Sequence, residues 1–268
     1  MEIGGENHIK MRQVKYTIIT VCYNAERFIE NTIRSVLMQD YGQYEYVIQD
    51  GGSSDATMEI VKTLLEGNDK ARIFSRKDKG IYDAMNQAVQ HAEGEYILFL
   101  NAGDAFCDKA VLGKVTDYIL SQKADLFFGN IVQIDGENRN IRKYGCMYKS
   151  KLMFLTGDSI CHQAIFAKRE MFERLFDISY RVCADREWQL YWLSRKANFK
   201  AIPVEISNVL VNGFSTAHLS EYEEEARKCI VKYFPKLYWI YLTVERLKRN
   251  KITLFFFRTV ENLLWKKE

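Results

Sequence analysis

The most chemically suggestive run in this 268-residue chain is Asp50-Gly51-Gly52-Ser53-Ser54-Asp55. Two consecutive glycines permit a sharp turn and let a ligand approach the backbone closely. Asp50, which precedes them, is placed to accept hydrogen bonds from a nucleobase or a ribose. The alternative is that Ser53 or Ser54 only caps the helix that follows. The sequence contains neither G-x-G-x-x-G nor G-x-x-x-x-G-K-[ST], which disfavours a dehydrogenase and a P-loop ATPase.

Alternating strand and helix patterns must position this run. Short apolar, β-branched runs predict strands at 16–22, 44–49, 71–75 and 95–100, and apolar residues at helical spacing predict helices between them. This alternation indicates right-handed crossovers and a parallel sheet, so the first half is predicted to be α/β. Ligands of such sheets bind outside the carboxyl ends of the strands. The polar loops expected there are 23–26, 50–55, 76–83 and 101–104.

The second half of the chain has a looser pattern. It predicts strands at 123–134, 161–167 and 201–211 and a helix at 186–194. No Pro/Gly/Ser-rich linker, repeat or low-complexity stretch separates the two halves, which indicates one continuous core. We therefore expect a lead at 1–14, a main domain at 15–217 and a C-terminal helical extension at 218–268.

Composition excludes several classes of protein. With 47% hydrophobic residues and 2 prolines, the chain is not a disordered tail, and its net charge of +3 argues against nucleic acid as a partner. The longest apolar clusters are far shorter than the roughly 20 residues that a membrane-spanning helix needs. The first 15 residues lack the apolar stretch of a secretory signal, so a cytoplasmic location is expected. The six scattered cysteines suit reduced, mostly buried thiols better than a zinc site.

Four segments together point to a known family: TVCYNAERFI (20–29), QDGGSSDAT (49–57), DKGIYDAMNQAVQHAEGEYILFLNAGD (78–104) and ADREWQL (184–190). In order and spacing, the chain from about 15 to 211 resembles the family 2 glycosyltransferases of the nucleotide-diphospho-sugar transferase (GT-A) fold. The resemblance implies a Rossmann-like, mostly parallel central sheet flanked by helices. It also implies a hexosyltransferase-type enzyme with a nucleotide-sugar donor, most often UDP-linked.

The resemblance assigns nucleotide-binding roles to Tyr23, Asn24, Glu26, Asp50, Asp78, Lys79 and Gly80. The first three would line the base pocket, Asp50 would contact the uracil, and Asp78 would contact the nucleoside. A ring beneath a base and a carboxylate at its polar edge suit selective nucleotide binding. The alternatives are that Tyr23 belongs to the core and that Lys79 is an ordinary surface charge.

The segment Leu100-Asn101-Ala102-Gly103-Asp104 stands where the family usually carries acidic D-x-D residues. Asp104 is its one acidic residue and the expected ligand of a divalent cation, Mn²⁺ or Mg²⁺, which stabilises charge on the leaving diphosphate. Asn101 could offer an oxygen to the cation or to the donor. Without a cation, Lys79, His162 or a helix N-terminus would have to stabilise that charge. The residues assigned to the donor sugar or acceptor are Asp83, Asn101, Ala102, Gly103, His162 and Gln163.

A sugar transfer also needs a base for the acceptor hydroxyl. The resemblance gives this role to Asp185 and implies a single in-line displacement that inverts the anomeric configuration. Asp185 could also be a helix N-cap, and Glu187 is the reserve candidate for the base. His162 could be purely structural. His218, after the Gly213–Thr216 loop, is a weaker candidate for closing over the diphosphate.

The tail from 246 to 268 carries seven Lys/Arg and two Glu residues, a net charge of +5, with Phe and Trp interspersed. This pattern is typical of a helix lying at a membrane interface, or of one packed on its own domain or in a homodimer. The first reading fits a glycan acceptor carried on a lipid, in surface polysaccharide biosynthesis on the inner face of the cell membrane. The rival functions are a nucleotide-sugar-binding protein with little or no catalysis and a sugar nucleotidyltransferase.

Overall fold

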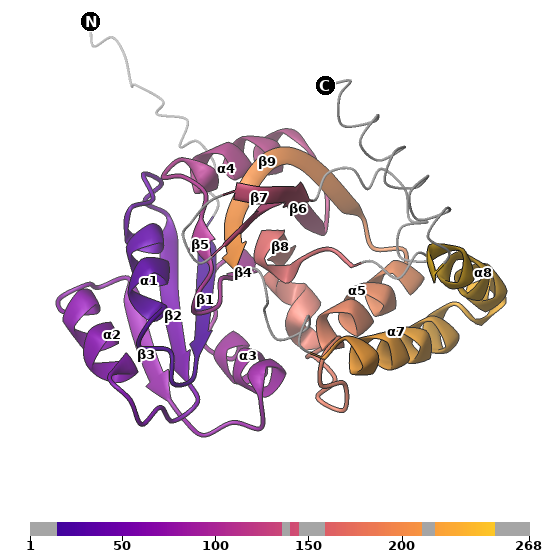
Figure 1. The fold of residues 1–268 in the computed structure, drawn as a ribbon. Coiled ribbons are helices and arrows are strands. Elements are labelled where there is room, and N and C mark those ends of the chain that lie inside the picture. Colours follow the sequence, from indigo (N-terminus) through magenta and orange to yellow (C-terminus); the bar gives the residue numbers. More distant parts are fainter. Residues whose placement is uncertain (1–14, 136–139, 145–158, 211–217, 250–268) are drawn as a thin grey trace, which may run out of the picture.

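The computed structural model describes residues 15–135, 140–144, 159–210 and 218–249. The first half alternates as predicted: β1 (Tyr16–Cys22), α1 (Ile29–Leu37), β2 (Tyr44–Asp50), α2 (Thr57–Leu65), β3 (Ala71–Ser75), α3 (Ile81–Val89) and β4 (Tyr96–Phe99). β1 pairs in parallel with β2 and β4, and β2 pairs in parallel with β3. The carboxyl ends of these strands therefore share one edge of the sheet (Figure 1).

The later elements extend this sheet with mixed polarity. They are β5 (Ala105–Phe106), α4 (Val111–Ser121), β6 (Leu126–Ile134), β7 (Asn140–Tyr144), η2 (His162–Ala164), β8 (Ile165–Lys168), η3 (Arg169–Glu173), α5 (Ala184–Ser194) and β9 (Phe199–Leu210). Within the described residues the strand order is β3-β2-β1-β4-β8-β6-β9-β5, with β7 beside β6. β8 runs antiparallel to β4 and β6, whereas β9 runs parallel to β6.

One predicted strand differs from the structure. Residues 161–167 do not form a single strand, because the one-turn η2 helix comes first and only then does the chain enter β8. This turn presents His162 to partners on two other segments, Asn101 and Asp185. The predicted helix 186–194 begins two residues earlier, so that Asp185 lies in its first turn.

The apolar side chains form two clusters. One contains buried residues of α1, α2 and α4, and the other contains buried residues of α3 and α5. The second cluster also receives side chains of the helices α7 (Leu219–Tyr233) and α8 (Tyr238–Arg249), which η4 (Pro235–Leu237) connects. α7 therefore packs on the core beside α5 (Figure 1). Within the described ranges, no helix is both long and apolar enough to cross a membrane.

Candidate active site

The loops after β1 and β2 are tied together by their own polar groups. The backbone N–H of Asn24 donates to Ser53 Oγ (2.8 Å), and the backbone N–H of Ser54 donates to Asn24 Oδ1 (2.9 Å). Glu26 joins the same loops, because its Oε2 accepts the backbone N–H of Ala56 at 3.0 Å. Asn24 adopts a φ of 47°, a left-handed conformation that asparagine tolerates. Asn24 and Glu26 thus fix the shape of the paired loops.

Asp50 is buried at the end of β2. Its carboxylate accepts hydrogen bonds from the backbone N–H groups of Gly52 and Ser53 and from the hydroxyls of Ser53 and Ser75. These bonds hold the glycine turn in place. A direct contact between Asp50 and a base would require some of them to be exchanged. Ser53 is committed to this carboxylate and does not cap α2, since the N-cap of that helix is Ala56.

Tyr23 presents its ring to solvent beside this turn. Its side chain is 64% exposed, so Tyr23 is not a core residue. A Cβ on Gly51 would collide with Asp78 Oδ2 and lie 3.4 Å from the ring of Tyr23, so the glycine allows both side chains to approach the turn. Burial raises the pKa of Asp78, and the nearby carboxylates of Asp83 and Asp50 raise it further. The three loops thus bring an aromatic face and a carboxyl group together.

The loop before α3 is held by two aspartates. Asp78 accepts the backbone N–H of Gly80 at 2.8 Å, and Asp83 accepts the backbone N–H of Lys79 at 2.9 Å. Gly80 has a φ of 127°, a backbone conformation that strongly favours glycine. The side chain of Lys79 is exposed. Asp83 therefore shapes the loop that the sequence analysis assigned to the nucleotide.

A chain of hydrogen bonds links four separate segments at the carboxyl edge of the sheet. Asn101 follows β4, and its Nδ2 lies 2.9 Å from His162 Nε2. His162 Nδ1 lies 3.2 Å from Asp185 Oδ2. Tyr82 of α3 donates to Asp185 Oδ1 at 3.0 Å. With Asn101 as the donor to Nε2, the imidazole carries its proton on Nδ1 and donates it to Asp185.

The environment of Asp185 favours its charged form. Burial alone would raise the pKa of this carboxyl, but the hydrogen bond from His162, together with the bonds from Tyr82 and the backbone of Arg186, lowers it below its usual value. The side chain is 14% exposed. Asp185 lines a small cavity together with four aromatic residues, Phe99, Phe172, Phe176 and Trp188. Asp185 is not the N-cap of α5, a position held by Cys183. The site therefore holds an ionised carboxylate of the kind that a general base requires.

Asp104 has the opposite environment. It is buried, and Gln163 Nε2 donates to its Oδ2 at 3.0 Å. Burial raises the pKa of Asp104 to about 6, although Gln163 and His162 act in the opposite direction. Nearby, Asn101 Oδ1 is buried with no hydrogen-bond partner among the described residues. Ala102 and Gly103, between them, are half-buried in the turn. In the part of the chain that the structure describes, no three His, Cys, Asp or Glu side chains are grouped as a metal site.

A family model described as "Glycosyl transferase family 2" matches residues 17–183. This match spans more than half of the chain; it includes the loops after β1 to β4 and His162, and it ends two residues before Asp185. The chain belongs to glycosyl transferase family 2. The predicted class of enzyme, a hexosyltransferase-type glycosyltransferase, is thereby confirmed.

Curated relatives of this family agree with the match. A glycosyltransferase of PGL/p-HBAD biosynthesis from Mycobacterium bovis is 32% identical over 186 residues, which cover 68% of this chain and 71% of the relative. An uncharacterized glycosyltransferase from Mycobacterium tuberculosis is 28% identical over 219 residues, or 78% of either chain.

Solved structures confirm the predicted GT-A fold. The fragment 1–349 of Staphylococcus aureus TarS superposes with a TM-score of 0.64 at 17% identity, covering 82% of this chain and 66% of that fragment. The same fragment has been solved with UDP-GlcNAc. A mannosyltransferase from Pyrobaculum calidifontis, in complex with GDP-Man and Mn²⁺, superposes with a TM-score of 0.60 at 16% identity, covering 96% of this chain and 82% of that one.

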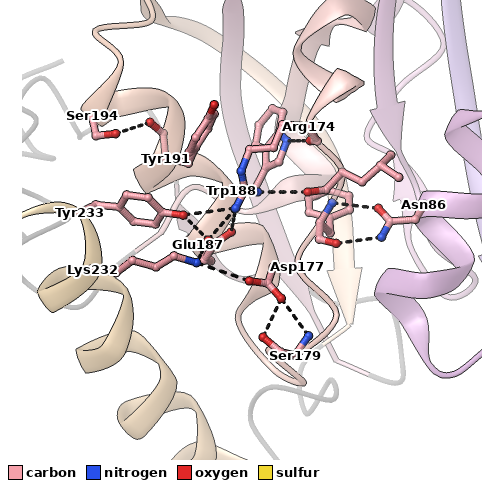
Figure 2. A network of polar contacts seen from close by, with 12 residues as sticks. Asn86, Arg174, Asp177, Ser179, Glu187, Trp188, Tyr191, Ser194, Lys232 and Tyr233 are labelled. Carbon is pink, nitrogen blue, oxygen red and sulfur yellow. Dashed lines mark hydrogen bonds and ion pairs between the residues drawn. The ribbon is translucent and has the colours of Figure 1, made fainter.

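The structure of this family 2 chain separates the two candidates for the base. Glu187, the reserve candidate, is fully buried and forms an ion pair with Arg174 (2.7 Å) and another with Lys232 (2.8 Å), and Tyr233 also bonds to it. Figure 2 shows this network on the side of α5 that faces α7. Arg174 also donates to Oε2 at 2.9 Å, so both carboxylate oxygens of Glu187 are bonded within this network and Asp185 remains the candidate.

Tyr82 is a residue of the site that the sequence analysis missed. It lies in the quoted segment 78–104, next to the apolar stripe of α3, and looks like an ordinary helix residue. Its partner Asp185 lies 103 positions further along the chain, so no local spacing reveals the bond. The Gly213–Thr216 loop and the tail from 250 lie outside the described residues. His218, at the N-cap of α7, is described.

Proposed function

We propose that this family 2 glycosyltransferase transfers a sugar from a UDP-sugar to a glycan hydroxyl, with Asp185 as the general base and with inversion of the anomeric configuration. The observation that carries the proposal is the Asn101–His162–Asp185 chain of hydrogen bonds, which holds an ionised carboxylate beside the carboxyl edge of the sheet. β4, which leads to Asn101, pairs directly with β1, which leads to Tyr23. The base and the nucleotide loops therefore border the same edge.

The proposed reaction is a single displacement. The acceptor oxygen attacks the anomeric carbon while its proton passes to the Asp185 carboxylate, and the bond from that carbon to the diphosphate oxygen breaks. Asp185 becomes a carboxylic acid and the nucleoside diphosphate leaves with the bonding electrons. His162, through Nδ1–H, orients the carboxylate before transfer. No second carboxylate is assigned as a nucleophile, so one displacement inverts the anomeric centre.

The donor would bind over the loops after β1, β2 and β3. The exposed ring of Tyr23 offers a stacking face for the base, and Asp78 offers an acceptor at its edge. α3 begins after Gly80 without a side-chain capping bond, so its N-terminus is a candidate for contact with the phosphates. TarS has been solved with UDP and the mannosyltransferase with GDP-Man, which supports a nucleotide-sugar donor and leaves the choice of base to experiment.

A divalent cation fits the residues present if the donor supplies part of its ligands. Asp104 would give a carboxylate and Asn101 Oδ1, which is buried without a partner among the described residues, would give an amide oxygen. Diphosphate and water oxygens would complete the shell, as Mn²⁺ and Mg²⁺ sites with few protein ligands allow. When bound, the cation would stabilise negative charge on the departing diphosphate. Gln163 holds the Asp104 carboxylate in place.

The acceptor is proposed to be a lipid-linked glycan at the cytoplasmic face of a membrane. The described start of α8 supports a peripheral contact, because Trp239 is 76% exposed and Ile240 is 48% exposed on adjacent positions. The basic tail 246–268 follows them in sequence. The alternative is that the same helix forms the interface of a homodimer. Sedimentation with anionic and neutral vesicles, together with the molar mass in solution, distinguishes the two.

The test of the proposed function is turnover of a panel of UDP-, GDP-, dTDP- and CDP-sugars, with and without Mn²⁺, followed by release of the nucleoside diphosphate. Asp185→Asn should retain donor binding and lose transfer by roughly 100-fold or more, the usual size of a general-base contribution. Wild-type turnover by this variant would refute the role of Asp185. Release of pyrophosphate would instead indicate a nucleotidyltransferase, and binding without release would indicate a nucleotide-sugar-binding protein.

A further inference from the structure

The carboxylate of Glu225, on α7, caps the segment that leads into α5, the helix that carries Asp185. Glu225 Oε1 accepts the backbone N–H of Arg181 at 2.7 Å. Glu225 Oε2 accepts the backbone N–H groups of Val182 and Cys183, at 2.9 and 3.0 Å. These three residues directly precede α5, whose second residue is Asp185. Three consecutive N–H groups at the start of α5 are thus satisfied by another helix.

This cap replaces one that the local sequence lacks. Cys183 stands at the N-cap of α5 and makes no side-chain capping hydrogen bond. Asp, Asn, Ser or Thr would normally fill that role from within the chain. Here the capping carboxylate comes from Glu225, more than 40 residues later, and adds its charge to those of Asp185 and Glu187 in the first turn of α5. The conformation of the turn that carries Asp185 therefore depends on α7.

The same turn is linked to the candidate base. The Tyr82 hydroxyl lies 2.9 Å from the carbonyl oxygen of Val182 and 3.0 Å from Asp185 Oδ1. Its single proton is shared between these two acceptors. If Val182 moved, the balance between them would change, and with it the support that Tyr82 gives to the Asp185 carboxylate.

A second anchor lies about two helical turns further along α7. Lys232 and Tyr233 bind the buried carboxylate of Glu187, two residues beyond Asp185 (Figure 2). Burial alone would lower the pKa of Lys232, but its hydrogen bond to Glu187 raises it. Between the two anchors, Cys229 of α7 contacts Cys183 through their thiols. α7 therefore holds both sides of the first turn of α5.

We propose that Glu225 is a positioning residue for transfer, through which α7 sets the orientation of Asp185. The inference rests on the proposed role of Asp185 as the base. Glu225 contacts the backbone of residues 181–183, directly before Asp185. The donor loops at 23–26, 50–55 and 76–80 are held by hydrogen bonds within and between themselves. Loss of the cap should therefore affect the transfer step and leave donor binding unchanged.

The experiment compares Glu225→Gln with Glu224→Gln. Glutamine has the shape of glutamate but only one acceptor oxygen, so at least one N–H of residues 181–183 would face an NH₂ group. Glu224 is the matched control on the same helix, since it is exposed and forms an ion pair with Lys228. Glu225→Gln should lower kcat by roughly 10- to 100-fold, the loss typical of a small misplacement of a catalytic group. The donor KM should stay within about twofold of wild type, and Glu224→Gln should match wild type.

The pH profile separates positioning from stability alone. The groups that face Asp185 are His162, Tyr82, Cys161, Cys183 and Tyr222, and those that face Glu225 include Cys183 and Lys228. If Glu225→Gln loosens the bonds that keep Asp185 ionised, the acid limb of kcat/KM should move to higher pH. A purely stabilising role would lower the melting temperature and leave both the limb and the kcat of the folded fraction unchanged.

Glu225→Asp covers the case in which Glu225→Gln does not fold. Aspartate keeps the negative charge, but its side chain is one methylene shorter, so the carboxylate lies further from the N–H groups of residues 181–183. An intermediate loss of kcat is expected. Wild-type kcat and an unmoved acid limb in whichever variant folds would overturn the proposal, provided that Asp185→Asn still abolishes transfer. If Asp185→Asn itself transfers sugar like wild type, the proposed function fails, and the two failures are thus distinguishable.

Discussion

Replacing His162 by Phe tests whether this histidine keeps Asp185 ionised. The change preserves a ring of similar size and removes the hydrogen bond from Nδ1 to Asp185 Oδ2. A hydrogen bond to a charged group is worth about 1.5–3 kcal/mol, and the lower end applies here because 3.2 Å is long for such a bond. Since about 1.4 kcal/mol corresponds to one pKa unit, the pKa of Asp185 should rise by about one unit.

The sign of the effect on activity follows from the proposed role of Asp185 as the base. Asp185 accepts a proton only as a carboxylate, so raising its pKa removes activity from the acid side. The acid limb of kcat/KM, measured by release of nucleoside diphosphate from pH 4 to 9, should therefore move upward by about one unit. His91→Phe is the control, because His91 stacks on Phe74 and is absent from the hydrogen bonds around Asp185. An acid limb that stays within about 0.3 units of wild type would refute the reasoning.

Three other substitutions distinguish effects on ligand binding or transfer from effects on the stability of the fold. Tyr23→Ala should weaken nucleoside diphosphate binding by about tenfold in calorimetric titration, because stacking on a base is worth roughly 1–3 kcal/mol. The melting temperature should stay constant, and an unchanged affinity would show that Tyr23 does not stack on the base. Gly51→Ala should displace Asp78 and weaken the same binding with little effect on stability, whereas Gly129→Ala, whose Cβ would collide with the backbone oxygen of Val204, should chiefly lower the melting temperature. Asp104→Asn should stabilise the free protein at pH 8 by up to about 3 kcal/mol and have little effect at pH 4, because the wild-type pKa of about 6 makes ionisation of the buried carboxyl costly as pH rises. The same variant should lose transfer, and equal melting temperatures at pH 8 would contradict the burial argument.

The first half of the fold could be predicted because its elements are locally determined. Every residue of β1 and β2 is buried, whereas α1, α2 and α3 each bury one face. The periodicity of apolar residues along the sequence therefore distinguishes the strands from the helices. The η2 turn could not be predicted in the same way. Its residues, His162 to Ala164, lie in a run with the composition of a strand, and they turn because His162 and Gln163 bond to side chains about 60 residues earlier.

The candidate site shows the same division between local and distant information. The polar loops were predictable because the carboxyl ends of parallel strands converge, and Tyr23 and Asp78 do meet across Gly51. The partners of each group were not predictable from spacing. Asp50 accepts a hydrogen bond from Ser75 on the neighbouring strand β3, and Asp185 is hydrogen-bonded to Tyr82 and His162 from two other segments. A motif thus indicates which residues gather at the edge, and the tertiary contacts decide which of them face a ligand.

The contrast between Asp185 and Asp104 narrows the assignment of roles. Both carboxyls are largely buried, but the bonds from His162 and Tyr82 lower the pKa of Asp185, whereas burial raises that of Asp104 to about 6. Two acids whose environments move their pKa values apart are suited to different tasks. Asp185 is charged at neutral pH before any ligand arrives, as a base must be. Asp104 is costly to ionise in the free protein and would gain most from a cation, so the two roles assigned to these carboxyls are not interchangeable.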